Sequence, residues 1–389
     1  MLNVHGLNRL LGVDRRSRLV KVEAGITLRD LNYLLQGQGL AMENLGDIDR
    51  QTVAGAISTA THGTGVSYRN ISAQVESLEL VLADGAVVEV SAESDPDAYR
   101  AARVGLGALG VVYSVTIRAM PDFTLRRLDS PRPLEETLDH LEELAARNDH
   151  FEFFVFPHTD TALLIERNRT AESPRPRGRV RAYLNDVLVE NYAMDLLARA
   201  GRSFPSRIPA LARFASRQLS RAEKVDRSYR VFASERRVRF TEMEYALPRD
   251  RGAEAVRAVL DLIESRELEV GFPIEFRLVA GDDAFLSPAH ERDTAYVAVH
   301  QYQGMEWERY FRAVEEIMDR LDGRPHWGKR HFQTADTLAE RYPRWTDFQR
   351  VRARLDPEGW FQNAYTERVL GPVATQAAIP QRNVLPSPR

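Results

Sequence analysis

The chain of 389 residues contains no cysteine. This absence excludes disulfides, thiolate nucleophiles and cysteine-ligated zinc or iron–sulfur sites. Long apolar segments are missing as well, since no run approaches the length that crosses a bilayer and residues 1–14 do not have the layout of a signal peptide. The sequence therefore predicts a cytoplasmic protein, and it leaves association with a membrane surface open.

Neither sign of charge is in clear excess, because 53 Lys and Arg residues stand against 56 Asp and Glu residues, for a net charge of -3. Such a balance produces no global field that attracts nucleic acid, so the expected partner is a small molecule. Common catalytic spacings are also missing. The nine histidines show no H-E-x-x-H motif and no serine lies in G-x-S-x-G, so we expect neither a metal site nor a serine hydrolase.

The length of the chain predicts two domains, since a single hydrophobic core rarely extends over 389 residues. The first domain, residues 1–122, has an α+β pattern with a hairpin at Asp84-Gly85, a dipeptide that tolerates positive φ. Its expected elements are strands at 19–24, 76–83, 87–90 and 111–119 and a helix at 28–36. Pro121 ends the last strand because proline cannot donate to a ladder, and we place the domain boundary after Asp122.

The second domain is predicted to span residues 123–371. Its expected elements are helices at 133–147, 254–266 and 307–321 and strands at 151–156, 242–246, 274–279 and 296–301. Residues 166–239 are rich in arginine, including Arg175, Arg177, Arg179 and Arg181, and we interpret them as a solvated surface of helices and loops. Residues 372–389 are rich in Pro and Ala and are expected to form a disordered tail.

Residues 105–110, GLGALG, satisfy the dinucleotide-binding string G-x-G-x-x-G. That motif requires a strand before it and a helix after it, so that helix N–H groups point at the pyrophosphate. Here a helical pattern at 97–104 comes first and a strand follows. The context therefore argues against a nicotinamide-binding site.

Residues 44–65, NLGDIDRQTVAGAISTATHGTG, combine Gly46, Gly55, Gly63 and Gly65 with small Ala, Ser and Thr residues. Such a stretch allows the backbone to approach a large flat ligand and offers N–H and hydroxyl donors to phosphates. A turn-rich packing segment has a similar composition, so composition alone leaves both interpretations open.

A polar group of residues gathers late in the chain, around His326-Trp327-Gly328-Lys329. The strand period places Glu275 and Arg277 on one face, and His300 and Tyr302 share a face of the next strand. Charged side chains that point inward from a sheet are costly unless they are paired or functional. Each residue alone is explained by a surface position or a salt bridge, whereas together they indicate a polar site.

Four stretches occur in one order along the chain: TVAGAISTATHGTG (52–65), GLGALGVV (105–112), HWGK (326–329) and DPEGWFQNAYTERVLG (356–371). With FTEMEYALP (240–248) and IEFR (274–277), they resemble the aldonolactone oxidase and alditol oxidase branch of the vanillyl-alcohol-oxidase flavoprotein family over nearly the whole chain. The resemblance implies an α+β fold with an N-terminal FAD-binding domain of the PCMH type and a C-terminal α+β cap domain that forms the substrate pocket.

The resemblance also implies roles for individual residues. The residues implied to contact the cofactor are Gly46, Asp47, Thr52, Gly55, Ala56, Ile57, Ser58, Thr59, His62, Gly63, Gly65, Gly110, Val111 and His326. Those implied to face the substrate are Glu275, Arg277, His300, Tyr302 and Lys329.

The implied reaction is oxidation of a carbinol of a sugar 1,4-lactone or a polyol by hydride transfer to flavin N5. Cationic Arg277 and Lys329 would stabilise negative charge that develops on oxygen and on the flavin, while Glu275 orients Arg277 and a substrate hydroxyl. Either His300 or Lys329 would accept the proton. The position of Gly46 implies an open approach for oxygen, so we expect an oxidase, with a dehydrogenase that uses another acceptor as the alternative.

The start of the chain departs from the family pattern. Family members begin with a strand–helix–strand unit and a glycine-rich loop of the type GSGHS, which often carries the histidine bonded to FAD. Residues 1–4 resemble the strand after that loop, and His5 has no glycine loop around it, so we expect an incomplete first domain and non-covalent FAD. We favour an internal methionine taken as the start over a truly shortened, flavin-free remnant.

Overall fold

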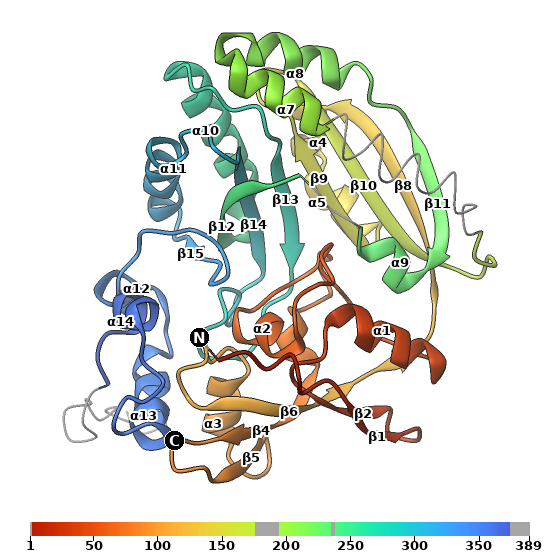
Figure 1. Ribbon diagram of the computed structural model, residues 1–389. Coiled ribbons are helices and arrows are strands. Elements are labelled where there is room, and N and C mark those ends of the chain that lie inside the picture. Colours follow the sequence, from red (N-terminus) through yellow and green to blue (C-terminus); the bar gives the residue numbers. More distant parts are fainter. Residues whose placement is uncertain (1, 176–193, 235–237, 374–389) are drawn as a thin grey trace, which may run out of the picture.

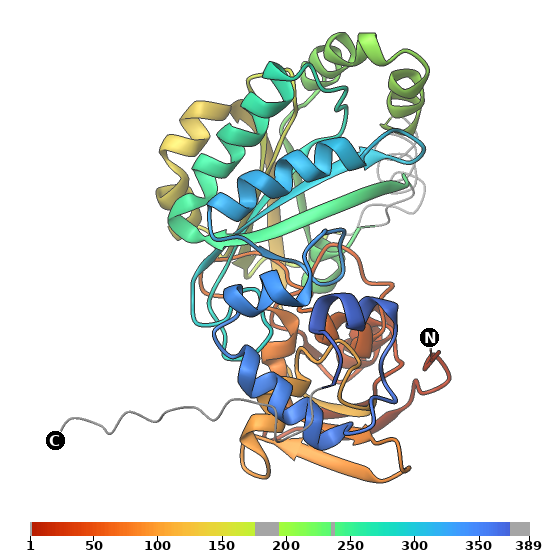
Figure 2. The same ribbon diagram turned by 90° about the vertical axis from the view of Figure 1, so that its left-hand side faces the viewer.

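The computed structural model describes residues 2–175, 194–234 and 238–373. Figures 1 and 2 show two bodies stacked on one another, with a small sheet in the lower body and a large sheet in the upper one. Arg177, Arg179, Arg181 and most of the predicted tail lie outside the described residues. Among the described residues, no helix combines the length and the apolar character that crossing a membrane requires.

The lower body is built on an antiparallel sheet in which the described strands follow the order β1-β2-β6-β4-β5. Its strands are β1 (Leu10–Asp14), β2 (Leu19–Glu23), β4 (Val75–Val81), β5 (Val87–Ser91) and β6 (Val111–Arg118), with a separate ribbon of β3 (Leu40–Ala41) and β7 (Met120–Pro121). Its helices are α1 (Leu28–Gly37), α2 (Val53–Ser58), the 3-10 turn η1 (Ile71–Gln74) and α3 (Pro96–Ala102).

The expected hairpin is confirmed. Val81 pairs with Val87, the N–H of Leu82 donates to the carbonyl of Ala86 at 2.9 Å, and Gly85 has a φ of 85°. The turn needs that positive φ, which an L side chain at this position would strain. The GLGALG loop follows α3 and precedes β6, as the sequence predicted, which is the reverse of a dinucleotide-binding turn.

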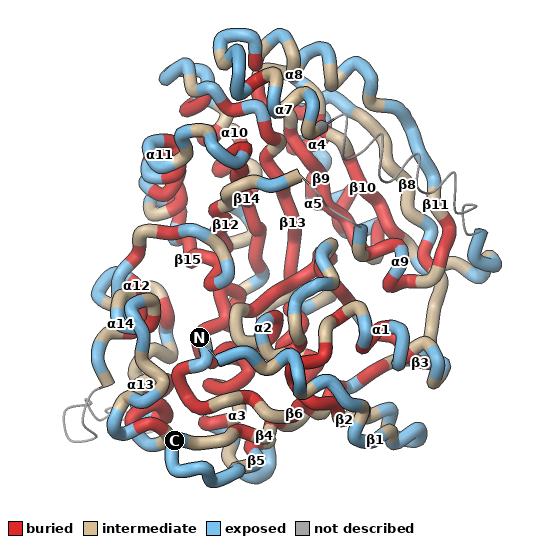
Figure 3. The backbone as a smooth tube through the Cα atoms, viewed as in Figure 1, coloured by how far each residue is buried: buried red, intermediate tan, exposed pale blue. Residues whose placement is uncertain are grey.

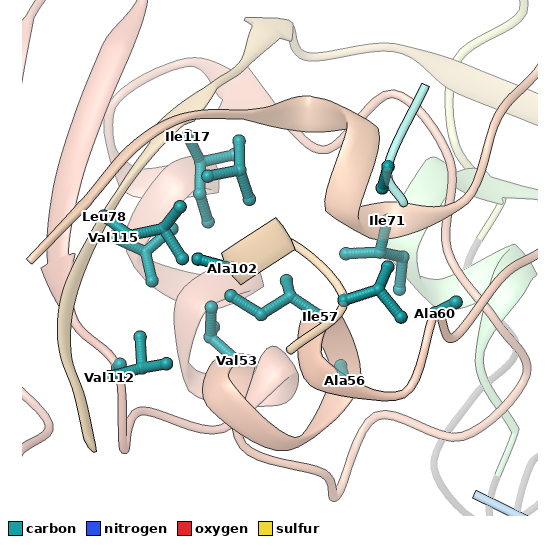
Figure 4. Packing of buried hydrophobic residues seen from close by; sticks show 14 of the residues in the cluster. Val53, Ala56, Ile57, Ala60, Ile71, Leu78, Ala102, Val112, Val115 and Ile117 are labelled. Carbon is teal, nitrogen blue, oxygen red and sulfur yellow. The ribbon is translucent and has the colours of Figure 1, made fainter. Parts of the chain in front are cut away.

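The core of the lower body is closed by the end of the chain. Figure 4 shows Val53 and Ile57 of α2 against Leu78, Val115 and Ile117 of the sheet. The same hydrophobic cluster also takes side chains from α12 (Ala335–Arg341), α13 (Trp345–Leu355) and α14 (Ala364–Leu370). Helix α13 lies beside α3 (Figure 1), and Figure 2 gives a second view of the same bodies, so segments more than 200 residues apart share one core.

The upper body contains an antiparallel sheet whose described strands follow the order β11-β8-β10-β9-β13-β14-β12-β15. Its strands are β8 (Thr124–Pro133), β9 (His150–Val155), β10 (Thr161–Thr170), β11 (Ala222–Arg227), β12 (Phe240–Pro248), β13 (Ile274–Val279), β14 (Thr294–Tyr302) and β15 (Arg324–Pro325). Its helices are α4 (Leu134–Asp139), α5 (Leu141–Ala146), α7 (Met194–Ser203), α8 (Ile208–Ser216), α9 (Ser228–Phe232), α10 (Gly252–Ser265) and α11 (Glu308–Arg320), with 3-10 turns η3 (Pro205–Arg207) and η4 (Arg249–Arg251). The strand β8 starts two residues after the predicted boundary at Asp122, which itself stays a prediction.

The central strands of this sheet are buried along their length (Figure 3). Their two faces differ in chemistry. One face carries apolar side chains such as Phe153, Phe276 and Val297, which pack with α4, α5, α10 and α11. Because side chains alternate along a strand, the other face receives the charged residues of the same strands. That charged face lies against residues 44–65 of the lower body, where the N–H of Gly65 donates to the carbonyl of Leu278 at 2.7 Å.

Two predicted elements differ from the structure. The single helix expected at 133–147 is broken into α4 and α5 at His140, whose ring Nδ1 lies 2.9 Å from the carbonyl oxygen of Glu136. The arginine-rich stretch was expected to form helices and loops, but β11 lies within it and pairs with β8. A strand at the edge of the sheet presents charged side chains to solvent, so its sequence reads as a polar surface.

Candidate active site

Two loop segments of the lower body, residues 44–47 and 62–65, cross so closely that no side chain fits between them at Gly46 or Gly63. A Cβ atom on Gly63 would lie 2.3 Å from the carbonyl oxygen of Leu45, and one on Gly46 would lie 3.0 Å from that of His62. Gly65 has a φ of 131°. The glycines thus bring bare backbone up to the charged face of the upper sheet.

Helix α2 joins these two segments. Thr52 caps the helix, since its Oγ1 accepts from the N–H of Gly55 at 3.1 Å, and Thr59 Oγ1 donates to the carbonyl of Gly55 at 2.9 Å. Ala56 and Ile57 point into the core, so only their backbone groups could contact a cofactor (Figure 4).

The glycine-rich loop before β6 reaches the end of α2. The N–H of Leu106 donates to the carbonyl of Ser58 at 3.2 Å. Gly110 has a φ of 142° and directly precedes Val111, the first residue of β6. The structure therefore places the predicted residues Ser58, Gly110 and Val111 in adjoining segments of the lower body.

Arg277 is the centre of a buried ion cluster at the contact of the two bodies. Its guanidinium donates to Asp47 Oδ1 at 2.7 Å and to Glu275, and its Nε lies 3.1 Å from Glu152 Oε2. Burial alone would lower the pKa of Arg277, but the three carboxylates raise it well above its ordinary value. Arg277 therefore stays cationic and joins β13 to the loop that carries Asp47.

The second cation of the site, Lys329, donates to the carboxylate of Glu242 on β12. His300 Nε2 lies 3.5 Å from the same carboxylate, and His300 Nδ1 is 2.9 Å from the carbonyl of Pro273. Burial raises the pKa of Glu242, but Lys329 and His300 lower it more strongly, to about 2. Burial lowers the pKa values of Lys329 and His300, whereas Glu242 shifts both upward overall.

The rings of His62 and His326 lie near each other, and His62 contacts Glu244. His62 Nδ1 lies 2.8 Å from the carbonyl oxygen of Gly63, its Nε2 lies 3.3 Å from Glu244, and its ring stacks on Tyr296 at 3.7 Å between centroids. The His326 ring is 5.5 Å from that of His62, and its Nδ1 accepts from the N–H of Gly328 at 3.0 Å. Burial lowers the pKa of His326 to about 3, so its imidazole is neutral near pH 7.

Ligand atoms of His62, Glu244 and His326 lie within 4.8 Å of one another, as do those of Glu242, Glu275 and His300. Sequence spacing could not reveal these groups, because each combines residues from separate segments. In both groups a histidine already contacts a carboxylate of the protein, His62 with Glu244 at 3.3 Å and His300 with Glu242 at 3.5 Å. The expectation that the protein uses no metal stays a prediction.

Tyr302 has contacts different from those of the other predicted substrate residues. Its hydroxyl donates to Asp195 Oδ1 at 2.8 Å, and its ring stacks on Phe272. It lines an apolar cavity beneath α7 and α8, together with side chains such as Leu197 and Ile208. Tyr302 thus lies at the end of β14 where the charged face meets this apolar cavity.

Four charged residues of the site received no role from the sequence: Glu152, Arg167, Glu242 and Glu244. Glu152 bonds Arg167 at 2.7 Å, and both side chains are buried. The strand alternation in FTEMEYALP would have placed Glu242 and Glu244 on one face, opposite Met243. Glu152 and Arg167 carried no comparable signal, because β9 pairs with β13 across a large distance in sequence and β10 pairs with the other edge of β9.

The residues present fit the flavin that the resemblance implies. Crossing glycine segments leave bare backbone, which a flat ring can approach closely. Arg277 and Lys329 are cations held by carboxylates at the same contact of the two bodies. Bound FAD would meet Gly46, Asp47, residues 52–59 and residues 62–65 on the lower body and these cations on the upper one.

The chain is similar to several known proteins. Residues 115–369 match the family described as D-arabinono-1,4-lactone oxidase, and residues 1–91 match an FAD binding domain. The L-gulono-1,4-lactone dehydrogenase of Mycobacterium tuberculosis is 52% identical over 96% of this chain and 86% of its own length. The L-gulonolactone oxidase of Mus musculus is 35% identical over 95% and 85% of the two chains.

A solved structure described as a solvent-stable cholesterol oxidase aligns with a TM-score of 0.78 at 17% identity, over 94% of this chain and 84% of that one. This likeness shows the fold, and it confirms the predicted α+β class with a PCMH-type FAD-binding domain. The predicted family is confirmed as well, because one family match alone covers more than half of the chain. The chain belongs to the D-arabinono-1,4-lactone oxidase family and is an FAD-dependent oxidoreductase.

Proposed function

We propose that the chain oxidises a CH–OH group of a sugar 1,4-lactone, for which bound FAD supplies the hydride acceptor. The observation that carries this proposal is the pair of buried cations, Arg277 and Lys329, each held by carboxylates where the two bodies meet. Fixed charges in a site that excludes water stabilise charge that develops on a substrate oxygen. The names of the relatives, a lactone dehydrogenase and a lactone oxidase, support the substrate class.

In this proposal the carboxylates bind the substrate and orient the two cations. Glu275 accepts a hydrogen bond from a substrate hydroxyl while it holds Arg277, and Arg277 donates to the lactone oxygen. Lys329 stays protonated because Glu242 raises its pKa, so it serves as a cation and not as a base. An uncharged polyhydroxyl substrate suits a pocket of this kind, since ionised carboxylates accept hydrogen bonds from hydroxyl groups.

We assign the proton acceptor to His300. Glu242 raises the pKa of His300, so the ring accepts a proton from the substrate only in the molecules in which it is neutral. In that form Nδ1, which faces the carbonyl of Pro273, carries the proton, and the lone pair is on Nε2. Glu242, 3.5 Å from that nitrogen, stabilises the imidazolium that forms when the substrate hydroxyl loses its proton.

We propose oxygen as the electron acceptor and non-covalent binding of FAD. The support for oxygen is the resemblance, which implies that a side chain at the position of Gly46 would block oxygen and that glycine does not. The relative from Mycobacterium tuberculosis is called a dehydrogenase, so a dye or another acceptor is the alternative.

The test begins with the visible spectrum of the purified chain after FAD is added. Bleaching of the flavin band by L-gulono-1,4-lactone or D-arabinono-1,4-lactone without oxygen is the expected result, and bleaching by a pentitol alone would favour a polyol substrate. Oxygen uptake then separates an oxidase from a dye-reducing dehydrogenase. Flavin that stays in the supernatant after acid precipitation of the protein would agree with non-covalent binding.

Two lysine variants sharpen the test. Lys329→Met removes the cation beside Glu242, and we expect kcat to fall by about 100-fold or more, as for loss of one charge-stabilising group. Lys21→Met is the matched control, because Lys21 pairs with Glu79 on the small sheet, and it should keep the activity of the unaltered chain. A protein that binds FAD yet is bleached by no lactone or polyol contradicts the proposal.

A further inference from the structure

A continuous chain of buried charges crosses three strands behind the proposed site. Arg167 on β10 donates to Glu152 on β9 at 2.7 Å, and Glu152 lies 3.1 Å from Nε of Arg277 on β13. Arg277 in turn donates to Asp47 of the lower body at 2.7 Å. Arg167, Glu152 and Arg277 are each at least 94% buried, so this arrangement differs from a surface salt bridge.

The three carboxylates contact different atoms of the Arg277 guanidinium. Asp47 and Glu275 both accept from Nη2, whereas Glu152 faces Nε. A guanidinium is planar, so a partner at one end leaves it free to turn about that end, and a second partner at Nε fixes its plane. The contact of Glu152 with Nε, at 3.1 Å, is an ion pair and not an aligned hydrogen bond, so it acts on the guanidinium through charge.

Glu152 is itself fixed from the other side. Burial raises its pKa, but Arg167 and Arg277 lower the pKa more, so the carboxylate stays ionised between two cations. Arg167 and Glu152 also line a small cavity with Asp47, Gly63 and Arg277, which brings the ion chain up to the glycine loop. A charge buried at this depth is costly unless it is paired, so a purely apolar wall would be the simpler packing.

We propose that Glu152 is a positioning residue that fixes the plane of the Arg277 guanidinium towards the substrate, with Arg167 holding Glu152 in place. This inference rests on the proposed function, because it assumes that Arg277 contacts the substrate. Glu152 acts through Arg277 and does not itself touch the reacting atoms.

The main test is Glu152→Gln, which keeps the shape of the side chain and removes its charge. We expect kcat to fall about tenfold or more with KM changed by less than about threefold, because misplacing a catalytic group by about 1 Å costs up to about 100-fold in rate. Glu152→Asp should recover part of kcat. The matched control is Glu166→Gln, on the neighbouring strand β10, because Glu166 is buried and bonds Arg147 at 2.9 Å.

A second measurement observes Arg277 without relying on turnover. In protein labelled with 15N at arginine Nε, the Arg277 resonance is assigned by its loss in Arg277→Lys. We expect Glu152→Gln to shift or broaden this resonance and Glu166→Gln to leave it unchanged. The double variant R167Q/E152Q removes the cation that the single variant leaves unpaired, so it serves if the single variant does not fold.

Several results would overturn the inference. One is normal kcat and an unchanged Arg277 resonance in Glu152→Gln. Another is a parallel loss of kcat and thermal stability in both glutamine variants, which indicates a structural role alone. If the unaltered holoprotein oxidises no lactone or polyol, the proposed function fails, and the Arg277 resonance still decides whether Glu152 orients Arg277.

Discussion

At the scale of single residues, the missing side chain of Gly63 decides whether the two loop segments can cross. A Cβ atom there would lie 2.3 Å from the carbonyl oxygen of Leu45 and 2.4 Å from Oδ1 of Asn44, which is buried. We predict that Gly63→Ala lowers the free energy of unfolding by roughly 1–3 kcal/mol, the usual cost of overpacking, and weakens FAD binding. Urea unfolding and titration with FAD measure both effects.

Gly37→Ala is the control for this prediction. A Cβ on Gly37 meets nothing within 4 Å, and the residue ends α1, so alanine should leave stability equal or slightly higher. Equal stability and equal FAD affinity in the two alanine variants would mean that the loops adjust freely and that their close crossing is not needed to bind FAD.

Residues of the site could be predicted to lie together only where both belong to one strand. Glu275 and Arg277 are two positions apart on one strand, so their shared face follows from the strand period, and the structure confirms it. Glu152 faces Arg277 because β9 pairs with β13, more than 100 residues later. Pairing between distant strands depends on the whole fold, so no local pattern could indicate that contact.

At the scale of secondary structure, α2 is short and depends on its cap. A helix of six residues has few internal hydrogen bonds, and Thr52 Oγ1 accepts from the N–H of Gly55 at 3.1 Å. We predict that Thr52→Ala destabilises the protein by about 1 kcal/mol, while Thr52→Ser, which keeps the hydroxyl, does so by less. Denaturant unfolding of both variants measures the difference, and an equal loss would point to the methyl group instead of the cap.

Most elements were predictable because their side chains repeat with a clear period. The strand expected at 274–279 matches β13, and the helix expected at 254–266 matches α10 within two residues at each end. The break between α4 and α5 was missed because Leu134, Leu138, Leu141 and Leu144 keep one apolar face across it. A contact of the His140 ring with the chain four residues earlier leaves no trace in that period.

At the scale of the whole molecule, buried histidines connect stability to pH. Burial lowers the pKa from the ordinary value of 6.5 to about 4 for His150 and to about 3 for His326 and His331. The unfolded chain therefore binds protons that the folded chain does not bind. Stability is complete above about pH 6.5 and is lost as pH falls towards these lower values, by about 1.4 kcal/mol per pH unit for each histidine.

The measurement is the urea midpoint at several values between pH 7.5 and pH 4.5. We expect the midpoint to fall on acidification, and to fall less steeply in His331→Gln, which removes one buried imidazole. His5→Gln is the control because His5 is exposed. Identical slopes in all three proteins would contradict the link between these histidines and acid lability.

The return of α12–α14 to the core of the lower body has a consequence for synthesis of the protein. The strands of the large sheet run from Thr124 to Pro325, whereas the first hydrophobic core needs side chains as late as Leu370. On the ribosome, the lower body is therefore synthesised first, but its hydrophobic core can be completed only after the last helices have been made. The apolar strands of its sheet, the last of which ends at Arg118, are made about 250 residues before Leu370, a delay in which chaperones protect nascent chains from aggregation.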